Sequence, residues 1–152
     1  MATSQPDPRA DRADRADRAD HADHADRAAV AAHISREIVR LHARMFGRGP
    51  TRAKTFVYDH FALCILEDVL TRAEKTLVSA GNVEQVHATR NAFQDAVRDD
   101  FVAIVEAATG QKVRAFVSQI HVNPELAAEL FLFEPDEVTT GSHDETPIAA
   151  DE

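Results

Sequence analysis

The 152-residue sequence lacks several features that would point to a class of protein. Cys64 is the only cysteine, which excludes an intramolecular disulfide and a zinc cluster of cysteines. No apolar run approaches the roughly 20 residues that a membrane-spanning helix needs. The N-terminal sequence MATSQPDPRAD has no apolar stretch like that of a secretory signal. We therefore expect a soluble, cytoplasmic chain without a membrane span, and the lone cysteine fits a reducing compartment.

An excess of basic charge is also absent from the central part of the sequence. The net charge of −9 comes from the two ends, because residues 1–27 hold five Arg and seven Asp, and residues 134–152 hold seven acidic residues and no base. Residues 28–133 carry twelve bases and twelve acids, so their formal charge is zero. A neutral domain offers no electrostatic footprint for nucleic acid, which we therefore do not expect as a partner.

Composition divides the chain into three segments. An Arg-Ala-Asp repeat begins at Arg9, and since alanine is its only apolar residue it has little to bury. We expect a disordered or partly helical arm over residues 1–27, a folded domain over 28–134 and a disordered acidic tail over 135–152. The repeat is either a polyampholyte interaction arm or a simple codon-repeat expansion, and the second explanation is favoured.

Hydrophobic periodicity and turn residues predict the order α-β-β-α-α-β-β and an α+β fold. Apolar residues three and four apart indicate helices, whereas β-branched and aromatic runs indicate strands. Thr71 and Glu74 match a capping box, and Gly47 and Gly110 suit helix ends. Two hairpins are expected to join into one antiparallel sheet with helices packed on it. The predicted elements are helices 28–46, 71–80 and 83–109, the latter capped by Asn82 and with Phe93 on its apolar stripe, and strands Lys54–Tyr58, Phe61–Leu66, Val113–Ile120 and Ala127–Phe133.

The strand Phe61–Leu66 is apolar on both of its faces. Phe61, Leu63 and Ile65 alternate with Ala62, Cys64 and Leu66. A strand that is apolar on both sides is normally covered on both. In so small a domain the second cover is expected to be another subunit, which predicts a homo-oligomer.

Side chains arranged for catalysis are not found in the sequence. There is no Ser-His-Asp order, nucleophile elbow or Walker sequence. Cys64 sits among aliphatic residues, which favours a small core residue over a nucleophile. His33 and His42 are nine residues apart and point to opposite sides of a helix, and we expect the histidines to be solvated surface residues. The sequence therefore predicts no enzyme, no metal site and no cofactor.

The loop from Gly47 to Lys54 is the main candidate for a binding site. It places Arg48, Arg52 and Lys54 in a glycine-bearing segment that can offer cations and backbone N–H groups to an anion or an acidic partner. The loop also follows a helix C-terminus, where the helix dipole favours cations, so Arg48 has the alternative role of capping the helix. Lys112 and Arg114 would add to this patch if the two hairpins lie side by side.

Five segments of the sequence carry a resemblance to a known family. They are Ile38–His42, Gly47–Lys54, Leu70–Leu77, Gln111–Val113 and His121–Ala128. Together they resemble the bacterial family named for the MpsC component of a sodium-translocating, membrane-potential-generating system, and the resemblance extends over about residues 30–135. It implies a soluble companion of membrane proteins that are linked to cation or inorganic-carbon uptake, and it implies no catalytic residues.

Two hypotheses about function follow. The first is a non-enzymatic accessory protein, a homo-oligomer that associates with membrane proteins of a translocation system and lies in the cytoplasm or at the inner face of the membrane. The alternative is a small-anion or nucleotide-binding sensor that uses the Gly47–Lys54 loop.

Overall fold

The computed structural model describes residues 8–135, and the side chains from residue 21 onward. The order α-β-β-α-α-β-β and the α+β class are confirmed. Its elements are α1 (Pro8–Phe46), β1 (Arg52–Val57), β2 (Phe61–Glu67), α2 (Arg72–Ser79), α3 (Val83–Thr109), β3 (Val113–His121) and β4 (Leu126–Phe133).

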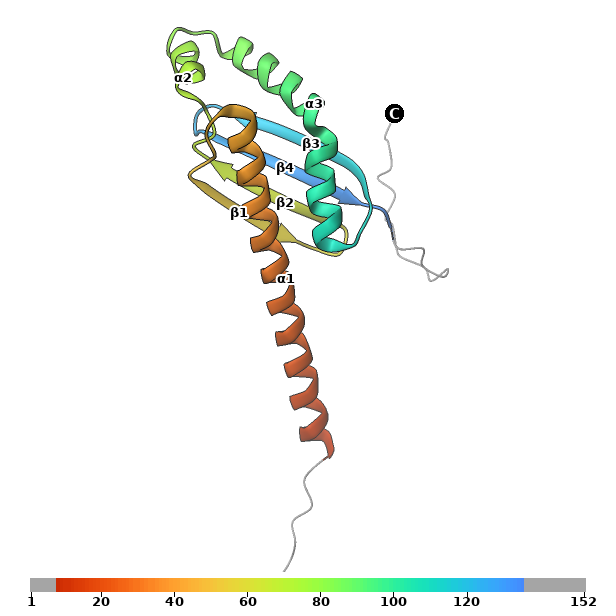
Figure 1. The fold of residues 1–152 in the computed structure, drawn as a ribbon. Coiled ribbons are helices and arrows are strands. Elements are labelled where there is room, and N and C mark those ends of the chain that lie inside the picture. Colours follow the sequence, from red (N-terminus) through yellow and green to blue (C-terminus); the bar gives the residue numbers. More distant parts are fainter. Residues whose placement is uncertain (1–7, 136–152) are drawn as a thin grey trace, which may run out of the picture.

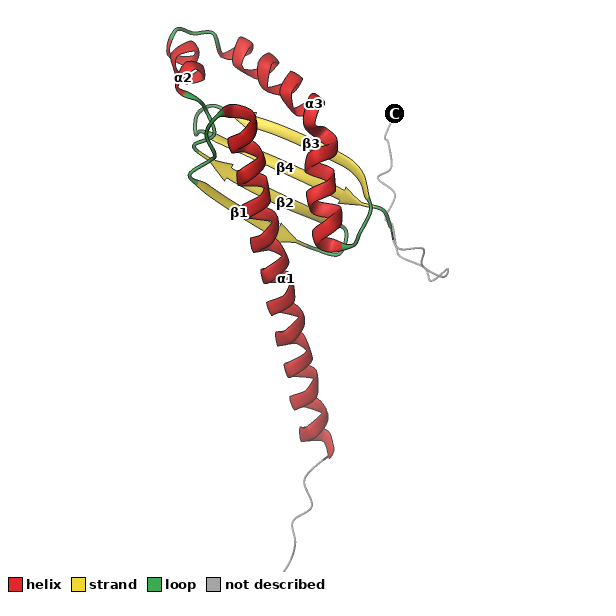
Figure 2. Ribbon diagram, in the orientation of Figure 1, coloured by secondary structure: helices red, strands yellow, loops and turns green. Residues whose placement is uncertain are grey.

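The four strands form one antiparallel sheet in the order β1-β2-β4-β3. Each predicted hairpin is present, and the pairing of β2 with β4 joins them. The first hairpin turns through Asp59-His60, where the Tyr58 N–H donates to the Phe61 carbonyl at 2.8 Å. Helices α1 and α3 pack on the same face of the sheet, so the domain has two layers (Figures 1 and 2). The core lies between these layers.

The apolar stripe predicted for α1 faces the sheet. Ile34 and Ile38 are fully buried, Leu41 is nearly so, and Gly47 ends the helix with a φ of +74°. The helix begins at Pro8, so the Arg-Ala-Asp repeat continues α1 where we expected a disordered or partly helical arm. Alanine is the strongest helix former, and Asp–Arg pairs four residues apart add to helix stability. The predicted acidic tail lies outside the described residues, except for Pro135.

Helices α2 and α3 begin and end close to the predicted residues. The capping box is present, because Thr71 Oγ1 accepts from the Glu74 N–H and Glu74 Oε2 accepts from the Thr71 N–H. Gly110 closes α3 in the left-handed conformation, with its N–H donating to the Glu106 carbonyl. Asn82 stands at the start of α3, but its side chain makes no capping hydrogen bond, unlike the cap that we expected.

The buried face of α3 differs from the predicted stripe. Phe93 is 43% exposed, although its ring contacts that of Phe46 at 5.3 Å. Arg90 and Gln94 are buried instead. The Arg90 guanidinium donates to both Glu74 carboxylate oxygens at 2.6 and 2.7 Å and to the Val69 carbonyl at 2.5 Å. These contacts let a charged residue occupy the interior.

Arg90 and Glu74 form a buried ion pair that connects α2 to α3. Arg90 is 1% exposed, and its guanidinium also lies 3.8 Å from the centroid of the Phe46 ring at the end of α1. Burial alone favours a neutral carboxyl group, but hydrogen bonds from Arg90 and from the Thr71 N–H hold the pKa of Glu74 below its ordinary value. Both charges are therefore present in the folded protein.

Removal of this pair's negative charge should destabilise the fold strongly. Glu74→Gln keeps the size of the side chain but leaves the Arg90 charge buried without its counter-ion. The free energy of unfolding should therefore fall by about 3–5 kcal/mol. Urea denaturation followed by circular dichroism measures it. The matched control is Glu67→Gln, whose exposed pairing with Arg52 at 3.5 Å should contribute no more than about 1 kcal/mol. Equal losses in the two variants would contradict the assigned role.

Candidate functional site

Arg48, the first of the predicted anion-binding residues, is engaged with the loop after β2. One guanidinium nitrogen lies 2.6 Å from Asp68 Oδ2 and the other donates to the Leu70 carbonyl at 2.7 Å. Lys75 Nζ also contacts Asp68 Oδ1 at 2.7 Å. Hydrogen bonds from Arg48 and Lys75 lower the pKa of Asp68 to about 2. Arg48 thus connects two loops, and these contacts are to the loop after β2 rather than to the end of α1.

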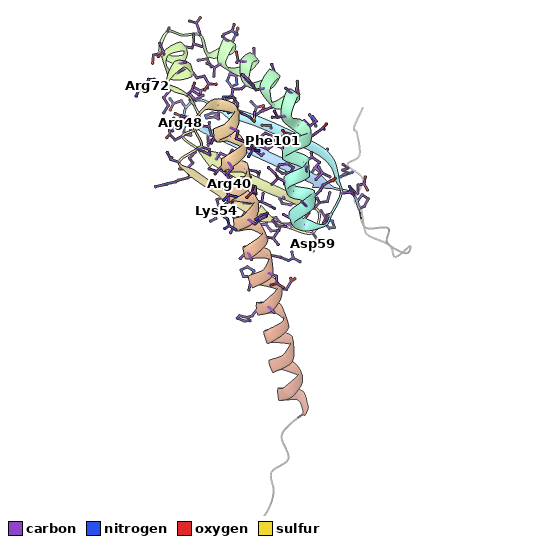
Figure 3. The ribbon with its side chains drawn as sticks, in the orientation of Figure 1. Arg40, Arg48, Lys54, Asp59, Arg72 and Phe101 are labelled. Carbon is purple, nitrogen blue, oxygen red and sulfur yellow. The ribbon has the colours of Figure 1, made fainter. Side chains whose placement is uncertain are left out.

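Arg52 and Lys54 lie on the exposed side of β1. The Arg52 guanidinium is 3.5 Å from Glu67 Oε2, and Lys54 Nζ lies 4.9 Å from the centroid of the Phe56 ring. Figure 3 shows Arg48 and Lys54 apart from each other. The loop therefore does not gather its three cations at one point in this structure, and anion binding there stays a prediction.

Lys112 and Arg114 do not extend this patch. They lie at the start of β3, the edge strand opposite β1 in the sheet. Lys112 Nζ pairs with Glu106 Oε2 at 3.0 Å. The hairpins do lie side by side, but their contact is through β2 and β4, so the full width of the sheet separates the two groups of cations.

The second face of the sheet is apolar, and no helix among the described residues covers it (Figure 1). We call this the open face. Its side chains alternate along each strand with the buried ones, and most are half-buried, whereas Val117 is 52% exposed. Tyr58, 50% exposed, packs its ring against Phe61 at 4.7 Å. The apolar residues of the open face are Phe56, Phe61, Leu63, Ile65, Ala115, Val117, Leu126, Ala128, Leu130 and Leu132.

The open face is continuous from edge to edge of the sheet. The strand register aligns Phe56, Leu63, Leu130 and Val117 in one row across all four strands. The next row toward the Asp59-His60 turn holds Phe61, Leu132 and Ala115. Charged residues enter only toward the other end, with Lys54 and Arg52 on β1 and Glu67 on β2. The expected double-sided apolar character of β2 is thus present, with one side buried by helices and the other half-buried.

A row of polar side chains crosses the opposite, helix-covered face. Thr55, Cys64, Glu129 and Ser118 are register partners on β1, β2, β4 and β3. The row begins at a hydrogen bond of 2.7 Å between the hydroxyl groups of Thr55 and Ser35 of α1. Glu129 is fully buried near the middle of the row. A carboxyl group in the core is costly unless it is paired, so the row marks a second candidate site.

His42 of α1 lies above Glu129. It is 1% exposed, so our expectation of a solvated surface histidine is wrong for this residue. Its Nε2 atom is 3.8 Å from Glu129 Oε1, and its ring contacts Phe46 and Phe101 at centroid distances of 5.5 and 5.7 Å. His42 is four residues after Ile38 and beside Leu41, so it shares the wide apolar side of α1 that the sheet covers.

Cys64 is buried, but its surroundings differ from the aliphatic ones expected. Its register partners are Thr55 and Glu129. Burial, as the largest effect, raises the pKa of the thiol to about 11, and the negative charge of Glu129 acts in the same direction. A thiol that stays protonated at neutral pH is a poor nucleophile, which agrees with a core role.

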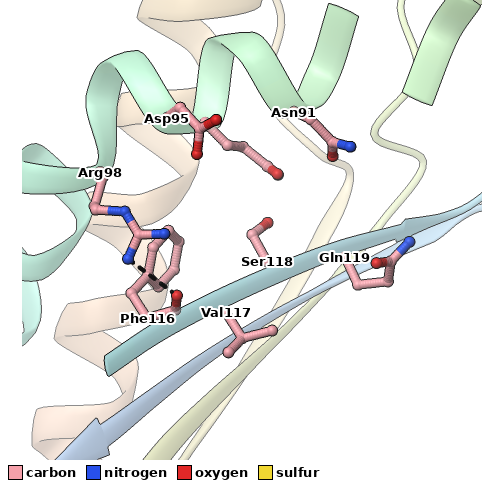
Figure 4. A pocket seen from close by; sticks show the side chains of 8 residues that line it. Asn91, Asp95, Arg98, Phe116, Val117, Ser118 and Gln119 are labelled. Carbon is pink, nitrogen blue, oxygen red and sulfur yellow. Dashed lines mark hydrogen bonds between the residues drawn. The ribbon is translucent and has the colours of Figure 1, made fainter. Parts of the chain in front are cut away.

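The polar row meets a groove between α3 and β3. The groove has a volume of about 330 Å³. Its α3 side is lined by Asn91, Asp95 and Arg98, and Ser118 lies on its β3 side (Figure 4). Arg98 donates to the Phe116 carbonyl at 3.1 Å. Ser118 points toward the helix, whereas Val117 points away from it (Figure 4). Among residues 21–135, no group of three or more His, Cys, Asp and Glu side chains is arranged to hold a metal ion.

Burial of Cys64 predicts both its reactivity and a pH dependence. Its thiol should react with a disulfide reagent at pH 8 only as the protein unfolds. Since an unfolded cysteine ionises near pH 8.5 and the folded one near 11, its contribution to stability is complete below about pH 8.5 and is lost as the pH rises toward 11. Thiol-labelling rates with and without urea, and denaturation at pH 8–10, measure these effects. Fast labelling of the folded protein would contradict the buried assignment.

Comparison with known proteins gives one match. The model of a family described as "Na+-translocating membrane potential-generating system (MpsC)" matches residues 26–135, which is 110 of the 152 residues. This is nearly the span over which the sequence resembles that family. No curated protein and no solved structure matches the chain. Within residues 8–135, no helix combines the length and the apolar composition needed to cross a bilayer.

Proposed function

The chain belongs to the MpsC family, whose description links it to a Na+-translocating, membrane-potential-generating system, and on that premise we propose that it is a non-enzymatic accessory module that acts through protein contacts. The open face is the observation that carries this proposal. Contiguous exposed apolar patches on a soluble domain typically mark interaction sites. The protonated state of the buried Cys64 thiol supports the non-enzymatic part.

We propose that a second copy of the chain occupies the open face. The face is the side of a sheet, and sheets stack face to face at about 10 Å. Four strands of six to nine residues give a footprint of about 19 by 25 Å, or roughly 475 Å². Side-chain relief raises the accessible area above this planar value, toward the roughly 800 Å² per partner of a standard interface.

Charge also favours self-association. Residues 28–133 have no net charge, so two copies of the domain do not repel each other as strongly charged domains would. The two rows of the open face nearest the Asp59-His60 turn contain no charged side chain that pairing would bury. Lys54 and Arg52 lie at one end, where they can remain in contact with water at the rim. A two-fold symmetric contact between copies fits these features.

The proposed place of action is the cytoplasmic side of the membrane, in association with membrane proteins of the translocation system. The family description supplies the link to that system, and the free thiol of Cys64 is compatible with a reducing compartment. Cell fractionation that recovers the protein with inner membranes only when the membrane components are co-expressed would support it. Recovery outside the inner membrane would contradict it.

A charge placed in the centre of the open face should separate the copies. Burial of a leucine side chain contributes about 1.5–3 kcal/mol to the free energy of association. Because Leu63→Asp removes this contribution from both copies of a symmetric dimer, the association constant should fall by a factor of about 100 or more. Light scattering coupled to size exclusion measures the mass of the full chain, and circular dichroism checks its fold.

The matched control for this experiment is Leu77→Asp, an exposed leucine of α2. It should leave the mass and the association constant unchanged. A wild-type protein that is monomeric at all concentrations tested would exclude the second copy as occupant. Equal effects of the two substitutions would show that the open face is not the contact.

The second proposal is binding of a small anion or a nucleotide at Arg52 and Lys54. Both lie two positions apart on the same exposed side of β1, which favours a shared contact with one anion. A ligand at 100 times its Kd should raise the free energy of unfolding by about 2.7 kcal/mol. Thermal-shift measurements with phosphate, bicarbonate and ATP test this, with Arg52→Glu expected to abolish any shift and Lys112→Glu to preserve it. No shift with any of the three probes would remove the proposal.

A further inference from the structure

We propose that the groove between α3 and β3 binds a small zwitterion, an α-amino acid with a polar side chain. The groove has a volume of about 330 Å³, at the small end of the range of about 300–1,000 Å³ that ligand pockets occupy. It lies on the helix-covered side of the sheet, opposite the open face. The proposal therefore depends neither on a second copy of the chain nor on anion binding at β1.

Two polar groups that line the groove lack hydrogen-bond partners in the part of the chain that the structure describes. Gln94 of α3 is only 8% exposed, yet its side-chain amide makes no hydrogen bond. Ser118 Oγ of β3 is buried and has no partner either. In folded proteins about nine in ten buried polar groups are hydrogen-bonded. An amide and a hydroxyl group left unpaired on the two walls of one groove therefore indicate a place for a polar ligand.

Opposite charges stand together on the α3 wall. Asp95 and Arg98 are three residues apart, so they are neighbours on one side of the helix. Among residues 21–135, however, Asp95 has no ion-pair partner. Arg98 donates from Nη1 to the Phe116 carbonyl at 3.1 Å, and its guanidinium lies 5.5 Å from the centroid of the Phe116 ring (Figure 4). These contacts hold Arg98 in place and leave its other N–H groups available to a ligand.

The two charges favour a ligand that carries both signs. An anion would bring its charge close to Asp95, and a cation would bring its charge close to Arg98. A zwitterion can place an ammonium group against Asp95 and a carboxylate against Arg98, and such charge-assisted hydrogen bonds are stronger than neutral ones. In an α-amino acid both groups are bonded to one carbon atom, which suits two side chains that are neighbours on a helix.

The unpaired amide and hydroxyl groups determine the kind of amino acid. A ligand side chain that both donates and accepts can complement the amide of Gln94 and the hydroxyl of Ser118. An apolar side chain would displace water from these two groups without replacing its hydrogen bonds, which costs affinity. A side-chain amide meets the requirement, so the probe that we choose is L-glutamine.

Titration of the isotope-labelled full chain with L-glutamine, followed by NMR, measures both the affinity and the place of binding. Saturable shifts of backbone amide signals should concentrate in residues 91–98 and 116–119. Two matched probes test the charges, because glutaramate lacks the ammonium group of glutamine and γ-aminobutyramide lacks its carboxylate. Each should bind about tenfold more weakly or worse, since each loses one charge-assisted hydrogen bond. L-Leucine should also bind more weakly than glutamine.

Three variants test the residues. Asp95→Asn should remove the preference for glutamine over glutaramate, because the amide no longer attracts the ammonium group. Ser118→Ala should weaken glutamine binding by up to about tenfold and leave leucine binding unchanged. This variant should fold normally, since the hydroxyl group makes no hydrogen bond in the protein. The matched control is Asp100→Asn, an exposed aspartate of α3 that does not line the groove and should leave every affinity unchanged.

An unchanged NMR spectrum at every glutamine concentration up to its solubility limit would overturn the proposal. Shifts confined to residues outside the groove would do the same. Equal affinities for glutamine, glutaramate and γ-aminobutyramide would overturn the zwitterion assignment, and equal effects of Asp95→Asn and Asp100→Asn would overturn the role of Asp95. None of these outcomes changes the mass measured by light scattering, so the test is separate from that of the open face.

Discussion

The buried guanidinium of Arg90, a residue of α3, fixes the positions of the other two helices and of the segment after β2 relative to α3. It binds the carboxylate of Glu74 on α2, the carbonyl of Val69 after β2 and the ring of Phe46 at the end of α1. Glu74 is also the residue that completes the capping box of α2. One interaction thus determines where α2 starts and how it sits on α3, which in turn places α3 over β3 and β4. The groove between α3 and β3 depends on α3 being held at this position.

The two faces of the sheet differ in chemical character, although only the strand backbones separate them. Successive residues of a strand point to opposite sides, so Glu129 lies in the helix-covered core while Leu130 lies on the open face. The sequence Leu126–Phe133 is almost entirely apolar because both sides must be: one meets the helices and the other, on our proposal, meets a second copy. Its single charged residue is the acid of the polar row.

Local sequence signals were sufficient to predict the architecture. The capping box, the glycines that end α1 and α3, and the Asp59-His60 turn each depend on a few neighbouring residues, and all were found as expected. What could not be predicted are contacts between polar residues distant in the sequence. Arg90 and Glu74 are 16 residues apart, Arg48 and Asp68 are 20 apart, and His42 and Glu129 are 87 apart. Period and propensity carry no information about such pairs. Of these residues, only Glu129 has a position that can be read from local sequence, because strand alternation places it on the same side as Phe131 and Phe133.

The length of α1 has a geometric consequence. An ion pair of 2.7 Å between Arg27 and Asp59 joins α1 to the turn between β1 and β2, and the N-terminal part of α1 extends past the edge of the sheet (Figure 1). From there to Pro8 the helix continues for about 20 residues, or about 30 Å. The N-terminal end of α1 is therefore displaced from the domain by about the thickness of a bilayer's hydrocarbon layer. A group attached at that end would be held about 30 Å from the domain by a single continuous helix.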